Sequence, residues 1–162
     1  MQSLPFNQRQ SLTILLLSPL VSIFSHLIRS SRRPHEIHFV YGARGNAELD
    51  AQSILFLPRL MDLVAAADDP NVTLSLYLTG TGDDGMIEHG KFPNRTFGRR
   101  ITEADLTRAL DGFKESLYGP EHDRQGTLCC VCGPPKMTDE VVGFLSRQPG
   151  MAPERVLCEK WW

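Results

Sequence analysis

The stretch Thr127-Leu-Cys-Cys-Val-Cys-Gly-Pro-Pro-Lys-Met137 predicts a buried strand, a tight turn and the start of a helix, and it decides the fold. Gly133 follows the apolar run and lets another molecule approach the backbone. Pro134 and Pro135 then fix the turn into the helix, whose amino end attracts negative charge. The turn therefore indicates a binding site, although a rigid connection explains it equally well when it is taken alone.

Similar apolar runs recur along the chain and alternate with segments of helical spacing. Strands are expected at residues 12–17, 36–41 (ended by Gly42), 72–78, 127–132 and 155–159. Helices are expected at about residues 19–30, 46–67 with a kink at Pro58, from 102 onward, and 136–147. Strands that alternate with helices predict a parallel sheet, so the expected fold is α/β: a Rossmann-like three-layer sandwich with a mainly parallel five-stranded sheet.

Three local patterns add detail to this expectation. Residues 72–78 alternate apolar and polar side chains, which predicts a more exposed position in the sheet. Residues 79–100 are rich in Gly, Asp and Asn without a clear period, which predicts a mobile loop. Thr102 and Asp105 have the spacing of a capping box and predict the start of the next helix.

The composition limits the classes of function. A chain of 162 residues with 41% hydrophobic content predicts one domain with a real core. The net charge of −2 and scattered Lys and Arg residues make nucleic acid an unexpected partner. The cysteines, at positions 129, 130, 132 and 158, do not suit a disulfide-stapled secreted fold and favour a reducing, intracellular compartment. Cys129 and Cys132 would point to opposite faces of their strand, so no metal site is expected.

The first 35 residues have two interpretations. They contain no acidic side chain and four arginines, which is typical of a mitochondrial transit peptide, with the cytoplasm as the other expected compartment. Alternatively, they form an N-terminal extension over residues 1–11 and then the first strand and helix of a domain spanning residues 12–162. Polar residues interrupt the apolar stretch before it reaches the ~20 residues that a bilayer requires, so no integral membrane span is expected.

Ligands of open parallel sheets bind beyond the carboxyl ends of the strands, where three segments of this chain are expected. They are Ser18-Pro-Leu-Val-Ser-Ile23, Tyr41-Gly-Ala-Arg44 and Cys132-Gly-Pro-Pro-Lys-Met137. Together these segments resemble the pyridine-nucleotide module of the ferredoxin-NADP reductase superfamily. The closing Glu159-Lys-Trp-Trp162 is similar, more narrowly, to the oxidoreductase NAD-binding domain-containing proteins.

The resemblance implies NAD or NADP as cofactor and a role for each matching residue. Cys132 and Gly133 would flank the nicotinamide ring, which makes Cys132 the candidate catalytic residue by position and not as a nucleophile. Arg44 would lie near the adenosine ribose, and Ser18 beside the pyrophosphate. The expected cofactor-binding residues are Ser18, Pro19, Leu20, Tyr41, Gly42, Ala43, Arg44, Cys132, Gly133, Pro134, Pro135, Met137 and Trp162. Three of them also have simpler interpretations: Cys132 as a small buried hydrophobe, Arg44 as solvated surface, and Trp162 as a seal on the sheet edge.

Two features depart from the superfamily pattern. Leu15-Leu-Leu17 precedes Ser18 where the superfamily usually has glycines, and side chains there would crowd the pyrophosphate. The flavin-binding barrel that normally precedes such a module is not expected in this chain. The expected function is therefore an NAD(P)H-binding oxidoreductase module that delivers hydride to FAD on a missing or separate domain, with a flavoprotein or electron acceptor as partner. The alternatives are a non-catalytic remnant with an interaction or regulatory role, and a flavodoxin-like domain that holds flavin itself.

Overall fold

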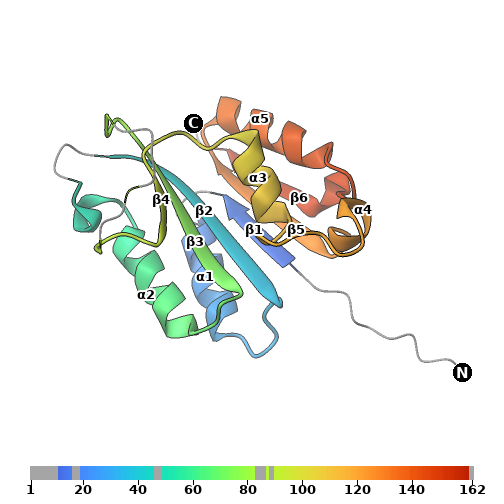
Figure 1. Ribbon diagram of the computed structural model, residues 1–162, viewed down its shortest axis with the longest axis horizontal. Coiled ribbons are helices and arrows are strands. Elements are labelled where there is room, and N and C mark those ends of the chain that lie inside the picture. The colour runs from blue at the N-terminus through green and yellow to red at the C-terminus, as the bar shows by residue number, and fades with distance from the viewer. Residues whose placement is uncertain (1–10, 16–18, 46–48, 83–86, 88–89, 161–162) are drawn as a thin grey trace, which may run out of the picture.

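The computed structural model describes residues 11–15, 19–45, 49–82, 87 and 90–160, which fold around one sheet (Figure 1). Its strands are β1 (Ser11–Leu15), β2 (Glu36–Arg44), β3 (Val72–Thr79), β4 (Arg95–Phe97), β5 (Thr127–Gly133) and β6 (Val156–Lys160). Its helices are α1 (Pro19–Arg29), α2 (Leu57–Ala67), α3 (Glu103–Leu110), α4 (Pro120–Asp123) and α5 (Pro135–Ser146). Residues 1–10, which make up most of the expected N-terminal extension, lie outside the described ranges.

The strands pair in parallel in the order β4-β3-β2-β1-β5-β6. The expected α/β class with a parallel sheet is confirmed, and the arrangement is compatible with a Rossmann-like fold. The expected number of five strands is wrong, because β4 adds a sixth at one edge. The chain builds from β1 outward to β4 and then crosses to β5 on the other side of β1, so the strand order reverses between β1 and β5.

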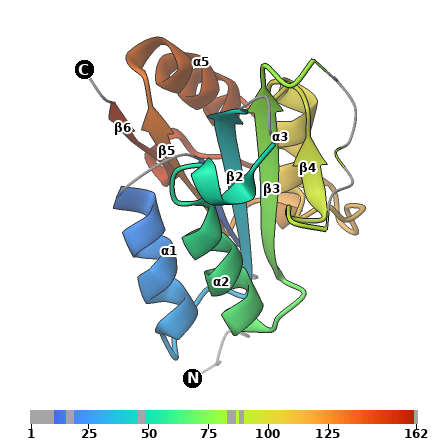
Figure 2. The ribbon, with the colours of Figure 1, turned by 90° about the vertical axis from the view of Figure 1, so that its left-hand side faces the viewer.

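Helices cover both faces of the sheet (Figures 1 and 2). Helices α1 and α2 pack in one cluster of buried side chains, and α3 and α5 pack in a second cluster. Strand β5 contributes side chains to both clusters, because successive side chains of a strand point to opposite faces. Cys130 and Cys132 belong to the α1–α2 cluster, whereas Cys129 and Val131 belong to the α3–α5 cluster. The expectation that Cys129 and Cys132 face opposite sides is confirmed.

Strand β4 lies within residues 79–100, where a mobile loop is expected, and the structure corrects that expectation. Thr96 at the centre of β4 is 0% exposed, and its hydroxyl donates to the carbonyl of Pro93 at 2.7 Å. Because β4 pairs along β3, β3 is an inner strand whose polar Ser75 is buried as well. The expected exposure of residues 72–78 is therefore wrong: their alternation reflects two packed faces and not a solvated one.

Two elements replace the single helix expected at residues 46–67. They are a short 3-10 turn, Ala51–Ser53, and helix α2. Pro58 lies in the first turn of α2, where proline is favourable, so it begins the helix instead of kinking it. The phenol of Tyr41 in β2 donates to the carbonyl of Leu55 at 2.6 Å and holds the segment between the two elements. Burial raises the pKa of Tyr41 to about 12, so this donor keeps its proton at neutral pH.

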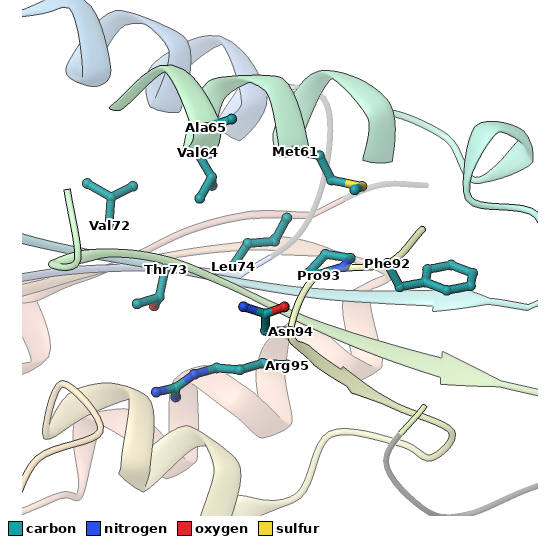
Figure 3. Close-up of a pocket in the computed structure, with 10 residues that line it drawn as sticks. All are labelled: Met61, Val64, Ala65, Val72, Thr73, Leu74, Phe92, Pro93, Asn94 and Arg95. Atoms are coloured by element: carbon teal, nitrogen blue, oxygen red, sulfur yellow. The ribbon is translucent and has the colours of Figure 1, made fainter. Parts of the chain in front are cut away.

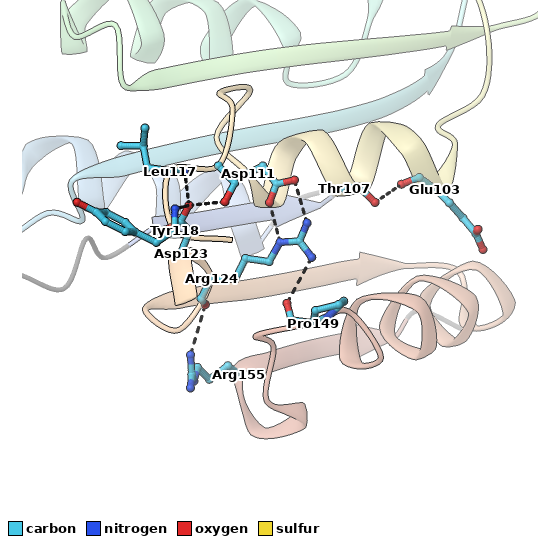
Figure 4. A network of polar contacts seen from close by, with 10 residues as sticks. Glu103, Thr107, Asp111, Leu117, Tyr118, Asp123, Arg124, Pro149 and Arg155 are labelled. Carbon is cyan, nitrogen blue, oxygen red and sulfur yellow. Dashed lines mark hydrogen bonds and ion pairs between the residues drawn. The ribbon is translucent and has the colours of Figure 1, made fainter. Parts of the chain in front are cut away.

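Helix α4 lies in the connection from α3 to β5 and has no counterpart among the expected elements (Figure 4). Buried Arg124, directly after α4, donates to both carboxylate oxygens of Asp111 at 2.6 and 2.8 Å. The carboxylate of Asp123 accepts from the Ser116 hydroxyl at 2.8 Å and from the Leu117 N–H at 3.0 Å. These polar contacts fix the crossover that brings the chain to β5.

Candidate functional site

A cavity of about 780 Å³ lies at the carboxyl ends of the strands, between α3 and α5. Its walls come from the ends of β2, β3 and β5, from the amino-terminal half of α3 and from most of α5. The strand order reverses between β1 and β5, and ligands of open α/β folds usually bind at the carboxyl ends of the strands near such a reversal. Its volume falls within the roughly 300–1,000 Å³ that is typical of small-molecule sites.

The end of β2 forms one wall, through Gly42, Ala43 and Arg44. The sequence pattern places these residues in a loop after Tyr41, but the structure keeps them in the strand, where Gly42 pairs with Tyr77 of β3. This corrects the expected end of β2, because the parallel ladder with β3 continues to Arg44. The small side chains at 42 and 43 leave the backbone open to the cavity, and exposed Arg44 lies at the rim.

The turn between β5 and α5 forms the opposite wall, through Gly133, Pro134, Lys136 and Met137. A Cβ added at Gly133 would overlap the Cε methyl of Met137, the flexible end of that side chain, so any larger residue here would displace Met137. Helix α5 begins after Pro134 without a side-chain cap. The N–H groups of its first turn have no intrahelical acceptor, so this helix end is suited to a negatively polarised ligand.

The amino end of α3 completes the cavity. The sequence patterns predicted this helix start but did not place its residues in the ligand site. Asp105 holds this helix end: its carboxylate accepts from Arg99 at 2.9 Å and from the Thr102 N–H at 2.9 Å. Burial alone would raise the pKa of Asp105, but the hydrogen bonds from Arg99 and Thr102 outweigh it and lower the pKa to about 2. The capping box expected from Thr102 and Asp105 is confirmed, with Arg99 as an additional partner. The lining residues missed are Tyr77, Thr79, Arg100, Ile101, Thr102, Glu103, Leu106, Val131, Glu140, Val141 and Phe144.

The charges around the cavity suit an anionic ligand with polar groups. Three basic side chains line it, Arg44, Arg100 and Lys136, against two acidic ones, Glu103 and Glu140. The amino ends of α3 and α5 both border the same space and add partial positive charge. Phosphate groups are the ligands that such helix ends and guanidinium groups bind best.

Several expected site residues lie elsewhere. Cys132 is 0% exposed, and its thiol packs in the α1–α2 cluster on the other face of the sheet. Tyr41 and Leu20 are buried in the same cluster, and Pro135 is the exposed first residue of α5. Pro19 begins α1. Ser18, Trp162 and the two leucines at positions 16 and 17 lie outside the described residues.

A second, smaller cavity of about 340 Å³ lies between α2 and the amino half of β3, beside β4 (Figure 3). Its wall combines Met61 and Val64 of α2 with Leu74 of β3 and Phe92. It is far from the strand ends that bear the sequence motifs.

Within the part of the chain that the structure describes, no group of three His, Cys, Asp or Glu side chains could hold a metal ion. No helix in the described ranges is long and apolar enough to span a bilayer.

The reversal of strand order beside β1 and the cavity at the carboxyl ends define an open α/β domain with a ligand crevice at its switch point. Two curated proteins are similar to the chain, and both are named "Oxidoreductase NAD-binding domain-containing protein 1". The Danio rerio protein is 30% identical over 153 residues, and the Homo sapiens protein is 31% identical over 158 residues. Each comparison covers 90% of this chain but only 48% and 42% of the relatives, so the chain spans about half their length or less. No family model matches the chain, and no solved structure matches it significantly.

Proposed function

We propose that this domain binds NADH or NADPH in the cavity at the carboxyl ends of the sheet and presents the nicotinamide to a flavin held outside the domain. The observation that carries the proposal is the cavity of about 780 Å³, which combines the Gly133–Met137 turn with two helix amino ends and three basic side chains. The names of the two similar proteins, which specify an NAD-binding domain, support the same ligand.

The residues present fit such a nucleotide. The backbone at Gly133 and the ring of Pro134 form a small apolar surface for the nicotinamide, next to Cys132 in the chain. Buried Cys132 supports this surface through its backbone, because its thiol faces the other side of the sheet. Arg44, at the rim beside the small residues of β2, suits the adenosine ribose or a phosphate on it. The segment after β1, which includes Ser18, is assigned to the pyrophosphate on the sequence motif alone.

When bound, reduced nicotinamide supplies a hydride that a flavin accepts, and this domain contributes position and electrostatics. The turn at Pro134 would orient one face of the ring, with Met137 beside it. Lys136 and the amino end of α5 would stabilise the phosphate groups of the nucleotide. The electron acceptor or flavoprotein partner approaches the open side of the cavity.

Calorimetric titration of the purified chain with NADH and with NADPH tests the proposal. We expect saturable binding of at least one nucleotide below about 1 mM, the usual upper limit for such cofactors. Arg44→Gln is expected to weaken binding, whereas Arg59→Gln, on the exposed side of α2 and outside the cavity, serves as the matched control. No binding of either nucleotide at millimolar concentration would overturn the proposal.

A non-catalytic interaction or regulatory role is the second candidate. Leu15-Leu-Leu17 favours it, because the resembling superfamily usually has glycines there. If the parent chain binds no nucleotide and the variant Leu16→Gly with Leu17→Gly gains binding, the loss is local to this segment. If the parent chain binds a nucleotide, Leu15-Leu-Leu17 no longer supports this second candidate.

A further inference from the structure

The hydroxyl of Thr138 is buried and makes no hydrogen bond with any of the described residues. Thr138 is 0% exposed, and no partner for its Oγ1 is found in those ranges. The backbone N–H of the same residue donates to the Pro134 carbonyl at 2.9 Å, so only the side-chain group is unsatisfied. A buried hydroxyl without a partner costs free energy, and such a group in a folded protein calls for an explanation.

This hydroxyl lies directly behind the wall of the proposed nucleotide site. It is 3.7 Å from the position that a Cβ at Gly133 would occupy, and Gly133 lines the cavity. The side chain of Met137 fills the space over Gly133, because its Cε would overlap the same Cβ. Met137 also lines the cavity and is only partly buried. The flexible Met137 side chain and the Thr138 hydroxyl therefore both border the space over Gly133.

The surroundings favour a ligand group that is neutral and polar. The cavity-lining residues nearest to this hydroxyl, Gly133 and Met137, carry no charge. A threonine hydroxyl both donates and accepts hydrogen bonds. A carboxamide also does both and is uncharged, so it can enter a pocket that excludes water without the desolvation cost of a phosphate.

We propose that the Thr138 hydroxyl binds the carboxamide of the nicotinamide ring once the Met137 side chain moves aside, an inference that rests on the proposed function. Methionine suits this movement because it is unbranched and adapts to irregular space. The hydroxyl would then fix the orientation of the ring against the Gly133 backbone. Thr138 is thereby a positioning residue for the nicotinamide and belongs to none of the motif positions assigned from the sequence.

Thr138→Val, which replaces the hydroxyl by a methyl group of similar size, tests this inference in the full chain. We expect the affinity for the nucleotide that the parent binds to fall about three- to tenfold, the loss of one net hydrogen bond. The affinity for the fragment without the nicotinamide ring, which is ADP-ribose for NADH and its 2′-phosphate for NADPH, is expected to stay the same. Thr138→Ser is expected to keep the parental affinity for both ligands. Thr107→Val, on α3 outside the cavity, is the matched control.

Two results would overturn the inference while leaving the proposed function intact. One is an unchanged nucleotide affinity in Thr138→Val. The other is an equal loss for the nucleotide and for ADP-ribose, which would assign the hydroxyl to another part of the ligand or to the fold. Thermal unfolding checks the fold, and Thr138→Ala provides a second variant without the hydroxyl if Thr138→Val does not fold. Failure of the parent chain to bind any nucleotide overturns the proposed function itself.

Discussion

Replacing Asp105 by asparagine removes the charge that holds the amino end of α3 at the cavity. The side chain is 2% exposed and accepts hydrogen bonds from Arg99, from the Thr102 N–H and from the Thr102 hydroxyl, the last at 2.8 Å. Its pKa in the folded protein is about 2, below the ordinary 3.8, because these hydrogen bonds outweigh the opposing effect of burial. The difference between the two pKa values corresponds to about 2 kcal/mol of stability, at about 1.36 kcal/mol per pH unit.

The direction in which stability changes with pH follows from the lowered pKa of Asp105. A carboxylate whose pKa is lower in the folded state stabilises the fold fully above pH 3.8, and this contribution is lost as the pH falls toward 2. We therefore expect Asp105→Asn to lower the free energy of unfolding by about 2 kcal/mol at pH 7, since half-buried Arg99 also loses its counter-charge. The deficit should shrink as the pH falls from about 4 to about 2.

Urea unfolding followed by circular dichroism, at several pH values between 7 and 2.5, measures this deficit. Asp139→Asn is the matched control, because that carboxylate is 64% exposed in its ion pair with Lys160. Exposed pairs contribute about 0–1 kcal/mol, so the control should differ little from the parent at any pH. A deficit for Asp105→Asn that is below about 0.5 kcal/mol at pH 7, or that does not change with pH, would refute the reasoning.

Two further predictions concern the site turn and the buried histidine. Gly133→Ala is expected to weaken nucleotide binding but to lower the free energy of unfolding by less than about 1 kcal/mol, because its Cβ overlaps only Met137 Cε, the flexible end of that side chain. A loss above about 2 kcal/mol in urea unfolding would argue against a mobile Met137 side chain. His38 is 2% exposed, and burial lowers its pKa below 6.5 despite the neighbouring carboxylate of Glu36, so the unfolded chain binds the proton more readily. The free energy of unfolding should therefore fall as the pH decreases below about 6.5. In urea unfolding at pH 7 and at pH 5, His38→Gln should show a smaller fall of this free energy than the parent chain. An equal fall in both proteins would contradict this prediction.

Local patterns in the sequence were sufficient for much of the fold. The alternation of apolar runs and helical segments depends on neighbouring residues alone, so it located most strands and helices within a few positions. The capping box of Thr102 and Asp105 is equally local and is confirmed. The strand alternation that separates Cys129 from Cys132 is confirmed for the same reason.

Tertiary contacts decided the remaining features. Strand β4 is three residues long and exists because it pairs with β3, a contact that no local pattern signals. Most of the cavity wall on α3 was missed, because the crossover after β4 brings that helix end beside α5 from a distant part of the chain. The Gly133 turn was recognisable from the sequence, but the unsatisfied hydroxyl of Thr138 behind it was not. A residue's own neighbours in the chain determine its backbone preference, whereas its partners across the fold determine which polar groups are left for a ligand.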